Sequence, residues 1–208
     1  MNTIPIILAS NSPRRKELLE LMGIPFTIQS STINETITKT KPEEVVIQLS
    51  SQKAIDVANT CNQDNSIVIG ADTIVWDNHR ILGKPKDESE AFRMIQDLQG
   101  NSHFVYTGVT IVETFQKKQT ITSFYEVTKV SFFPMTEKEI KAYVQTAQWD
   151  ANQKEMIYPW KDKAGGYGIQ TSFGTKYIKG IEGDYYNVVG LPVSALYQKL
   201  KEMNRGIV

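Results

Sequence analysis

The chain opens with a pattern that fixes the start of its fold, an apolar run followed at once by a helix start. The run from Ile4 to Ala9 has the length and composition of a buried strand. Ser12 is a favoured N-cap residue, Pro13 suits the first helical position, and Gly23 is placed to end the helix. A strand that leads directly into a helix favours the α/β class.

The first turn of that helix carries two arginines, Arg14 and Arg15. A helix dipole disfavours cations at this end by roughly 0.3–1 kcal/mol each. The pair is explained if an anion binds where the free N–H groups and the two guanidinium groups converge, and phosphate is the usual anion there. The alternative is a pair of solvated surface arginines.

Helix and strand patterns continue to alternate along the chain, and the mixture predicts an α/β fold with a mixed sheet. Capping patterns mark helix starts at Asp87 and Thr136. The β-rich runs His103–Thr114 and Thr120–Phe133 favour antiparallel pairing. The other expected elements are an extended piece at 26–30, helices over 42–58 and 192–203, a strand over 66–76 with an interruption, and a strand near 176–181.

Composition narrows the function classes. The 208 residues can form a single domain over 1–208 or two closely packed lobes. Acidic and basic residues balance at 23 each, so no global field favours nucleic acid or a membrane surface, and no apolar run reaches the roughly 18 residues of a membrane span. The single cysteine, Cys61, excludes an internal disulfide and fits a reducing compartment, so we expect a cytoplasmic protein.

Charged residues occur where a core is expected. Lys53 lies on the apolar stripe of the 42–58 helix, where a lysine either serves a site or extends past the edge of the core to water. Asp72 interrupts an apolar strand pattern, and such a carboxylate is costly unless it is paired or binds a metal. We expect the strand to end at Gly70-Ala71 with the acid at its carboxyl end, a usual place for an active-site residue. The alternative is an aspartate that satisfies a turn.

Two further charges complete the set. Lys84 lies in a rigid Gly-Lys-Pro turn, and Glu35 lies in a polar loop. Together the four cations and two acids indicate a site that binds a polyphosphate with Mg²⁺ or Mn²⁺. The chain has no GxxxxGK[ST] loop, no GxGxxG after a strand and no GxSxG motif, which weighs against the corresponding enzyme classes.

Seven segments resemble, in order and over nearly the whole chain, motifs of the Maf family of nucleoside triphosphate pyrophosphatases, also called septum formation inhibitor-like proteins. Each segment is a weak signal alone, but the ordered set is very specific. The segments are ASNSPRRKELLELMGI, QLSSQKA with Lys53, IGADTIV with Asp72, ILGKP with Lys84, VYTGV, DKAGGYGIQ and IEGDYYNVVGLP.

The resemblance implies a fold like that of the inosine triphosphate pyrophosphatases, a long mixed twisted sheet with flanking helices and two lobes around a cleft. It implies hydrolysis of a nucleoside triphosphate to the monophosphate and pyrophosphate with a divalent cation. By motif, Asp72 is the expected proton acceptor and shares the metal with Glu35. Arg15, Lys53 and Lys84 are expected to neutralise phosphate charge. Ser10 and Ser12 are expected to hydrogen-bond phosphate oxygens.

The SPRR, GADT and GIQ motifs resemble the branch of the family that acts on dTTP and UTP. By motif, Arg14, Thr73 and Gln170 are the positions that select the base. Alternatives that stay open are the same reaction on 7-methyl-GTP or modified purine triphosphates, and a non-catalytic nucleotide-binding regulator of cell division. The expected partner is the nucleotide, without nucleic acid or membrane, and a homodimer stays open.

Two segments depart from the family pattern, and both bear on substrate preference rather than on reaction class. The connection from Gln148 to Lys161 is longer than usual, and the residues from Thr171 to Gly174 replace a glycine-rich turn. Both flank the expected base-selecting Gln170. The longer connection carries the aromatic and proline residues Trp149, Tyr158, Pro159 and Trp160.

Overall fold

The computed structural model describes residues 4–61, 63–150 and 155–203, and it has the mixed α/β fold that the sequence predicts. The helices are α1 (Pro13–Glu20), α2 (Pro42–Thr60), α3 (Glu88–Leu98), α4 (Glu137–Gln145), the 3-10 turn η1 (Ala164–Gly166), α5 (Ser172–Tyr177), α6 (Tyr185–Val189) and α7 (Val193–Glu202). The strands are β1 (Ile6–Leu8), β2 (Thr27–Ile28), β3 (Asn65–Trp76), β4 (Ile81–Leu82), β5 (Ser102–Phe115), β6 (Lys118–Phe132), β7 (Gln148–Asp150), β8 (Glu155–Ile157) and β9 (Ile178–Glu182).

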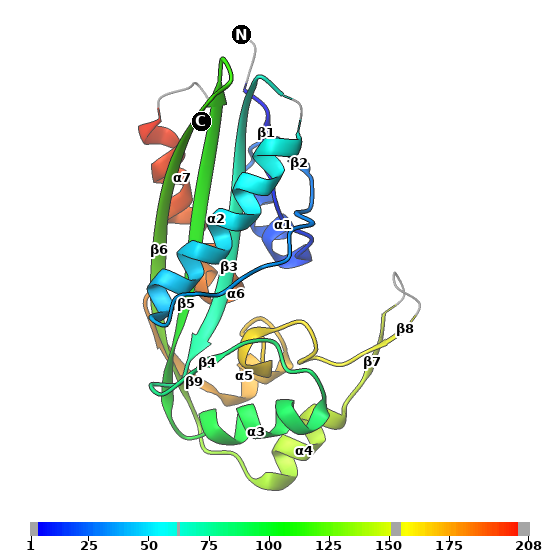
Figure 1. The fold of residues 1–208 in the computed structure, drawn as a ribbon. Helices are drawn as coiled ribbons and strands as arrows, with labels where there is room; N and C mark the ends of the chain where they lie inside the picture. The colour runs from blue at the N-terminus through cyan, green and yellow to red at the C-terminus, as the bar shows by residue number, and fades with distance from the viewer. Residues whose placement is uncertain (1–3, 62, 151–154, 204–208) are drawn as a thin grey trace. The chain divides into compact units, whose positions relative to one another are not determined.

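The main sheet is mixed and has the strand order β2-β1-β3-β5-β6-β9, with β4 paired to β3 (Figure 1). Strand β1 is parallel to both β2 and β3, with Ile7 opposite Thr27 on one side and Val68 on the other. The pairs β3·β4 and β6·β9 are antiparallel. Gln116 and Lys117 connect β5 to β6 in a two-residue turn, both at positive φ as such hairpin turns require.

The chain divides into two compact units, and three of the four boundaries between them fall inside the long strands β3, β5 and β6, while the fourth precedes α6. The single domain over 1–208 and the cleft between two lobes stay predictions. The first unit comprises Met1–Thr73, Tyr106–Glu126 and Tyr185–Val208, and the second comprises Ile74–Val105 and Val127–Asp184.

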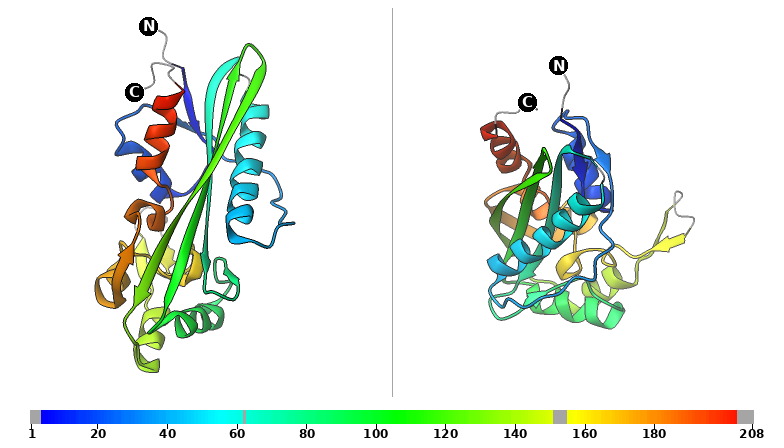
Figure 2. Two further views of the ribbon diagram at one scale, coloured as in Figure 1. Left: turned by 90° about the vertical axis from the view of Figure 1, so that its left-hand side faces the viewer. Right: turned by 45° about the horizontal axis from the view of Figure 1, so that its top comes forward.

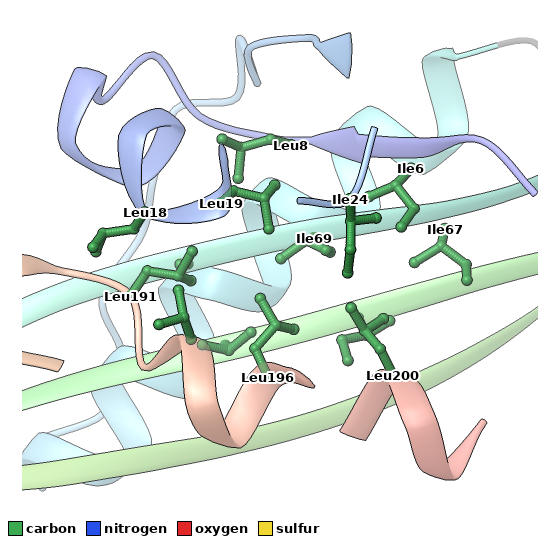
Figure 3. Close-up of a cluster of buried hydrophobic side chains, with 14 residues drawn as sticks. Ile6, Leu8, Leu18, Leu19, Ile24, Ile67, Ile69, Leu191, Leu196 and Leu200 are labelled. Carbon is green, nitrogen blue, oxygen red and sulfur yellow. The ribbon is translucent and has the colours of Figure 1, made fainter. Parts of the chain in front are cut away.

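In the first unit, helices cover both faces of the sheet, α2 on one and α1 with α7 on the other (Figure 2). The alternation of side chains along a strand explains this arrangement, because consecutive residues point to opposite faces. Ile6 and Leu8 pack with α1 and α7, whereas Ile7 packs with α2. The core on the α1 and α7 side, drawn in Figure 3, is built of aliphatic side chains from β1, α1, β3, β5 and α7, together with Ile24 and Leu191 from connecting segments.

Two glycines let α2 lie unusually close to the sheet. A Cβ atom at Gly70 on β3 would be 2.5 Å from the Ser50 carbonyl oxygen and 2.8 Å from the Ala54 nitrogen. A Cβ atom at Gly108 on β5 would collide with the backbone of Val46. Any larger residue would push the helix outward, so these glycines set the distance between α2 and the strands.

In the second unit, an aromatic cluster packs beside the capped helices α3 and α4. His103 is 1% exposed, its Nε2 lies 2.7 Å from the hydroxyl of Tyr167, and Phe132 packs edge-on against both rings. The expected helix starts are confirmed: the Asp87 side chain accepts from Glu90 N, and Thr136 forms a complete capping box.

Three expectations about local structure need correction or remain partly outside the described residues. Strand β3 does not end at Gly70-Ala71 but continues through Asp72 to Trp76. Ser12 is the N-cap residue, yet its side chain makes no capping hydrogen bond. Within the long connection from Gln148 to Lys161, β7 and β8 pair with each other, and residues 151–154 lie outside the described ranges.

The indole of Trp160, from the same connection, is buried and donates to the carbonyl of Val144 at 2.8 Å. Of the helices in the described ranges, none combines the length and apolar character needed to cross a bilayer.

Candidate functional site

Lys53 and Asp72 form the centre of the candidate site in the first unit. The Lys53 ammonium forms an ion pair with Asp72 Oδ1 and lies 3.3 Å from Glu35 Oε1. The Lys53 and Asp72 side chains are each 15% exposed, and that of Glu35 is 41% exposed. The close approach of α2 at Gly70, two residues before Asp72, brings the lysine to the strand.

This pairing explains the uninterrupted strand. An unpaired carboxylate between apolar residues would be costly, but the Lys53 ammonium supplies the opposite charge from the neighbouring helix. The strand can therefore keep its ladder through Asp72. The alternative of a turn aspartate is wrong, because Asp72 lies within β3. Lys53 pairs with it from α2, and its service in a catalytic site stays a prediction.

The segment that carries Glu35 is extended and exposed, and it is held along α2 by a row of polar side chains. Gln52 bonds the backbone of Thr36 in both directions: its Oε1 accepts from Thr36 N at 2.9 Å, and its Nε2 donates to Thr36 O at 2.7 Å. Gln48, which lies four residues before Gln52 on α2, accepts from Thr38 N at 3.0 Å. Sequence reasoning missed this row.

A signal for the row is nevertheless present in the sequence. Gln48, Gln52 and Asp56 recur at every fourth residue and so lie on one helix face. Asp56 completes the row by accepting from Thr32 N at 3.0 Å and from Ser31 Oγ at 2.7 Å. These hydrogen bonds hold the Asp56 carboxyl pKa below its usual range.

Arg15 is tied to three parts of the first unit. Its Nε donates to the carbonyl of Gly190 at 2.9 Å, its Nη1 to Ser10 Oγ at 3.4 Å and its Nη2 to Thr73 Oγ1 at 3.2 Å. Burial lowers the pKa of the guanidinium, and the charge of Asp72 opposes that shift. The group stays charged, because a guanidinium does not lose its proton in proteins.

A buried hydroxyl continues the network behind Arg15. Thr73 Oγ1 lies 2.9 Å from Thr107 Oγ1, and Thr107 Oγ1 donates to the carbonyl of Asn187 at 3.0 Å. Thr107 is fully buried on β5. It belongs to the VYTGV segment, to which sequence reasoning assigned no role.

The two serines near α1 are placed differently. Ser10 Oγ accepts from Ser12 N at 3.1 Å and from Arg15, so its own proton is left to donate to a ligand. Ser12 and Arg14 lie at the N-cap and in the first turn of α1. The structure thus brings Ser10, Arg15 and Thr73 into direct contact, as it does Lys53, Asp72 and Glu35.

Lys84 and Gln170 belong to the second unit, and both are exposed. Their segments meet there, because Gly165 N donates to the carbonyl of Gly83 at 3.0 Å. Gly165 and Gly166 both have positive φ, which the Ala-Gly-Gly turn requires and which glycine adopts without strain. That Lys84 and Gln170 share a site with Asp72 stays a prediction.

The donor set of the first unit fits a hard divalent cation. Glu35 and Asp72 converge on one ammonium, so their oxygens lie near a single point of positive charge. Mg²⁺ is commonly bound by one or two carboxylates together with substrate phosphates. The described part of the chain contains no group of three or more His, Cys, Asp or Glu residues, as an all-protein site would need.

A family model described as Maf-like protein matches residues 5–203. The chain belongs to this family. A relative from Bacillus cereus strain AH820, named dTTP/UTP pyrophosphatase, is 51% identical over 200 residues, which cover 96% of this chain and 95% of the relative. A Bacillus cytotoxicus protein of the same name is 49% identical over 201 residues, covering 96% of each chain.

Among solved structures, the Staphylococcus aureus Ham1 protein matches this Maf-like protein with a TM-score of 0.47 and 10% identity, over 96% of this chain and 99% of that one. A nucleoside-triphosphatase described as dITP/XTP pyrophosphatase from Mycobacterium abscessus matches with a TM-score of 0.35 and 9% identity, over 97% of each chain. These scores are too low to support a functional inference.

Proposed function

We propose that this Maf-like protein hydrolyses dTTP and UTP to the nucleoside monophosphate and pyrophosphate, with a divalent cation. The observation that carries the proposal is a sequence identity of 51% and 49%, over 96% of the chain, to two relatives named dTTP/UTP pyrophosphatase. The enzyme class follows from the same relatives, so the protein is a hydrolase of the nucleoside triphosphate pyrophosphatase class.

The geometry of the first unit supports this reaction. Arg15 and Lys53 bring two cations to the site, and Ser10 retains a hydroxyl proton for a phosphate oxygen. Fixed donors of this kind stabilise the charge that develops on a leaving pyrophosphate. Asp72 is the proposed proton acceptor: water forms a bond to the α-phosphorus, the bond from that phosphorus to the pyrophosphate oxygen breaks, and the water proton passes to the carboxylate.

Glu35 and Asp72 would hold the cation, and Lys53 pairs with both carboxylates in the structure. When bound, a divalent cation supplies positive charge to the phosphates. Lys53 then has an alternative partner in the phosphate, because its ammonium is a flexible point charge on a long stem. The preference for thymine and uracil rests on the motif positions Arg14, Thr73 and Gln170.

A substrate panel tests the proposal. Purified protein is given dTTP, UTP, CTP, GTP and 7-methyl-GTP at equal concentration, with Mg²⁺ or Mn²⁺ varied, and pyrophosphate release is measured. We expect dTTP and UTP to react fastest and the rate to vanish on chelation. Faster cleavage of either guanine nucleotide would overturn the substrate proposal, and the absence of any metal-dependent release would overturn the function.

A further inference from the structure

The buried hydroxyl of Thr107 lies at the end of a hydrogen-bond series that leads to Arg15. Thr107 Oγ1 lies 3.0 Å from the Asn187 carbonyl oxygen and 2.9 Å from Thr73 Oγ1. Thr73 Oγ1 in turn lies 3.2 Å from Arg15 Nη2. Both threonine hydroxyls have one proton to donate. The positions of these protons can therefore be worked out from the acceptors.

The carbonyl of Asn187 can only accept, so the Thr107 proton points to it. Thr107 Oγ1 is then an acceptor toward Thr73, and the Thr73 proton fills the 2.9 Å gap between the two hydroxyls. If Thr73 donated instead to the Gly190 carbonyl at 3.4 Å, that gap would contain no hydrogen and two oxygens would repel. The series therefore runs in one direction, from Arg15 to Thr73 to Thr107 to Asn187.

This direction has consequences for both residues that face the site. Thr73 donates to Thr107, so toward Arg15 and toward a ligand it is only an acceptor. Arg15 has five N–H donors, and the described residues engage one on each nitrogen through Gly190, Ser10 and Thr73. One N–H on Nη1 and one on Nη2 are left for an anion.

We propose that Thr107 is a positioning residue: its buried hydroxyl fixes Thr73 as an acceptor, and Thr73 in turn orients Arg15 with two N–H donors directed to the substrate phosphates. The inference rests on the proposed function for the identity of that substrate. Thr107 itself touches neither the nucleotide nor the reacting atoms, because it is fully buried behind Thr73.

Thr107→Val tests the proposal, since valine keeps the shape and removes the hydroxyl. We expect kcat/KM to fall about tenfold, as for the loss of one buried hydrogen-bond partner. Thr107→Ser should recover most of that loss. Thr114→Val is the matched control, because Thr114 lies on the same strand β5, is 8% exposed and has no hydrogen-bond partner for its hydroxyl among the described residues. It should keep the wild-type rate.

A double-mutant cycle separates positioning from a general structural role. In a Thr73→Val background the link to Arg15 is already absent, so adding Thr107→Val should change kcat/KM less than twofold, a limit close to the usual error of additivity. Equal tenfold losses in both backgrounds would overturn the proposal. If Thr107→Val does not fold, the same cycle is run with Thr107→Ala, with Thr107→Ser as the hydroxyl-bearing comparison.

Binding of inorganic tripolyphosphate, followed as the rise in melting temperature, gives a readout without catalysis. Wild type and Thr114→Val should show the same rise, and Thr107→Val a smaller one. An equal rise in all three would contradict the proposal. Failure of the proposed function would appear differently, as wild-type protein that cleaves no nucleoside triphosphate.

Discussion

The two sides of the candidate site in the first unit are held in different ways. Arg15 is fixed by hydrogen bonds to folded backbone and buried hydroxyls, and the series behind it ends on the fully buried Thr107. Glu35 lies on an exposed segment that Gln52 holds to α2. Exposed hydrogen bonds exchange with water at little cost, whereas buried groups left without a partner are costly.

We infer that the Arg15 side serves phosphate binding and that the Glu35 side serves metal binding. The Arg15 side is preorganised and can direct N–H groups at phosphate without rearrangement. On the proposed mechanism, the exposed Glu35 carboxylate, which lies 3.3 Å from the Lys53 ammonium, would adjust when a cation takes the place of that ammonium. Variants on the Arg15 side should therefore change both stability and turnover, and variants on the Glu35 side should change mainly the dependence on metal.

Asp72→Asn removes the proposed proton acceptor, the carboxylate that pairs with Lys53, and it should give the largest effect. The amide keeps the shape but loses charge and basicity, so kcat should fall by at least about a hundredfold. The measurement is pyrophosphate release under saturating dTTP and metal. Circular dichroism checks that the variant is folded, and a folded variant with the wild-type rate would remove Asp72 from the mechanism.

Arg15→Lys tests the preorganised side. An ammonium cannot reproduce three donors in the fixed geometry of a guanidinium, so at least one of the Gly190, Ser10 and Thr73 acceptors loses its partner. We expect about 1–3 kcal/mol less stability and roughly tenfold lower kcat/KM. Denaturant unfolding and initial rates measure the two effects. A rate loss without any loss of stability would mean that these hydrogen bonds do not hold the site.

Gln52→Leu tests the adjustable side. Losing both hydrogen bonds to Thr36 frees the segment that carries Glu35, so the metal concentration for half-maximal rate should rise roughly tenfold. Because the bonds are exposed, stability should change by less than about 0.5 kcal/mol. Gln119→Leu, on an exposed glutamine that bonds Asn59, is the matched control. If excess metal does not restore the rate of Gln52→Leu, the prediction that the Glu35 side affects mainly the metal dependence is wrong.

A substitution at His103 in the second unit should change the pH dependence of stability and leave the metal dependence of the reaction unchanged. Burial lowers the His103 pKa to about 4, below its usual value near 6.5. The unfolded chain therefore binds a proton first, so the stability from neutral His103 is complete above about pH 6.5 and is lost as pH falls toward 4. The full loss is on the order of 3 kcal/mol.

Unfolding free energies of wild type and His103→Gln, measured from pH 7 to 4.5, test this expectation. The variant should lack the part of the decline that belongs to this histidine, and at pH 7.5 it should keep the wild-type metal dependence. Parallel pH curves for the two proteins would show that His103 is not the group that titrates.

Much of the local structure follows from short-range patterns. The helix starts at Pro13, Asp87 and Thr136 were readable because capping and proline geometry act within one turn. The expected end of β3 at Gly70-Ala71 is wrong, because a charged residue such as Asp72 inside an apolar run resembles a strand end when only the local sequence is considered. The strand continues because its counter-ion Lys53 comes from a helix nineteen residues earlier in the chain.

The sequence by itself determined the class of fold, the family and the set of charged residues, because periodicity, caps and ordered motifs are written along the chain. Only the tertiary structure decided which of those charges meet. Gly70 and Gly108 bring α2 against the sheet, and the contact places Lys53 on Asp72. The Thr107 hydroxyl acquires its direction from a carbonyl eighty residues away, a constraint that packing creates and no local pattern contains.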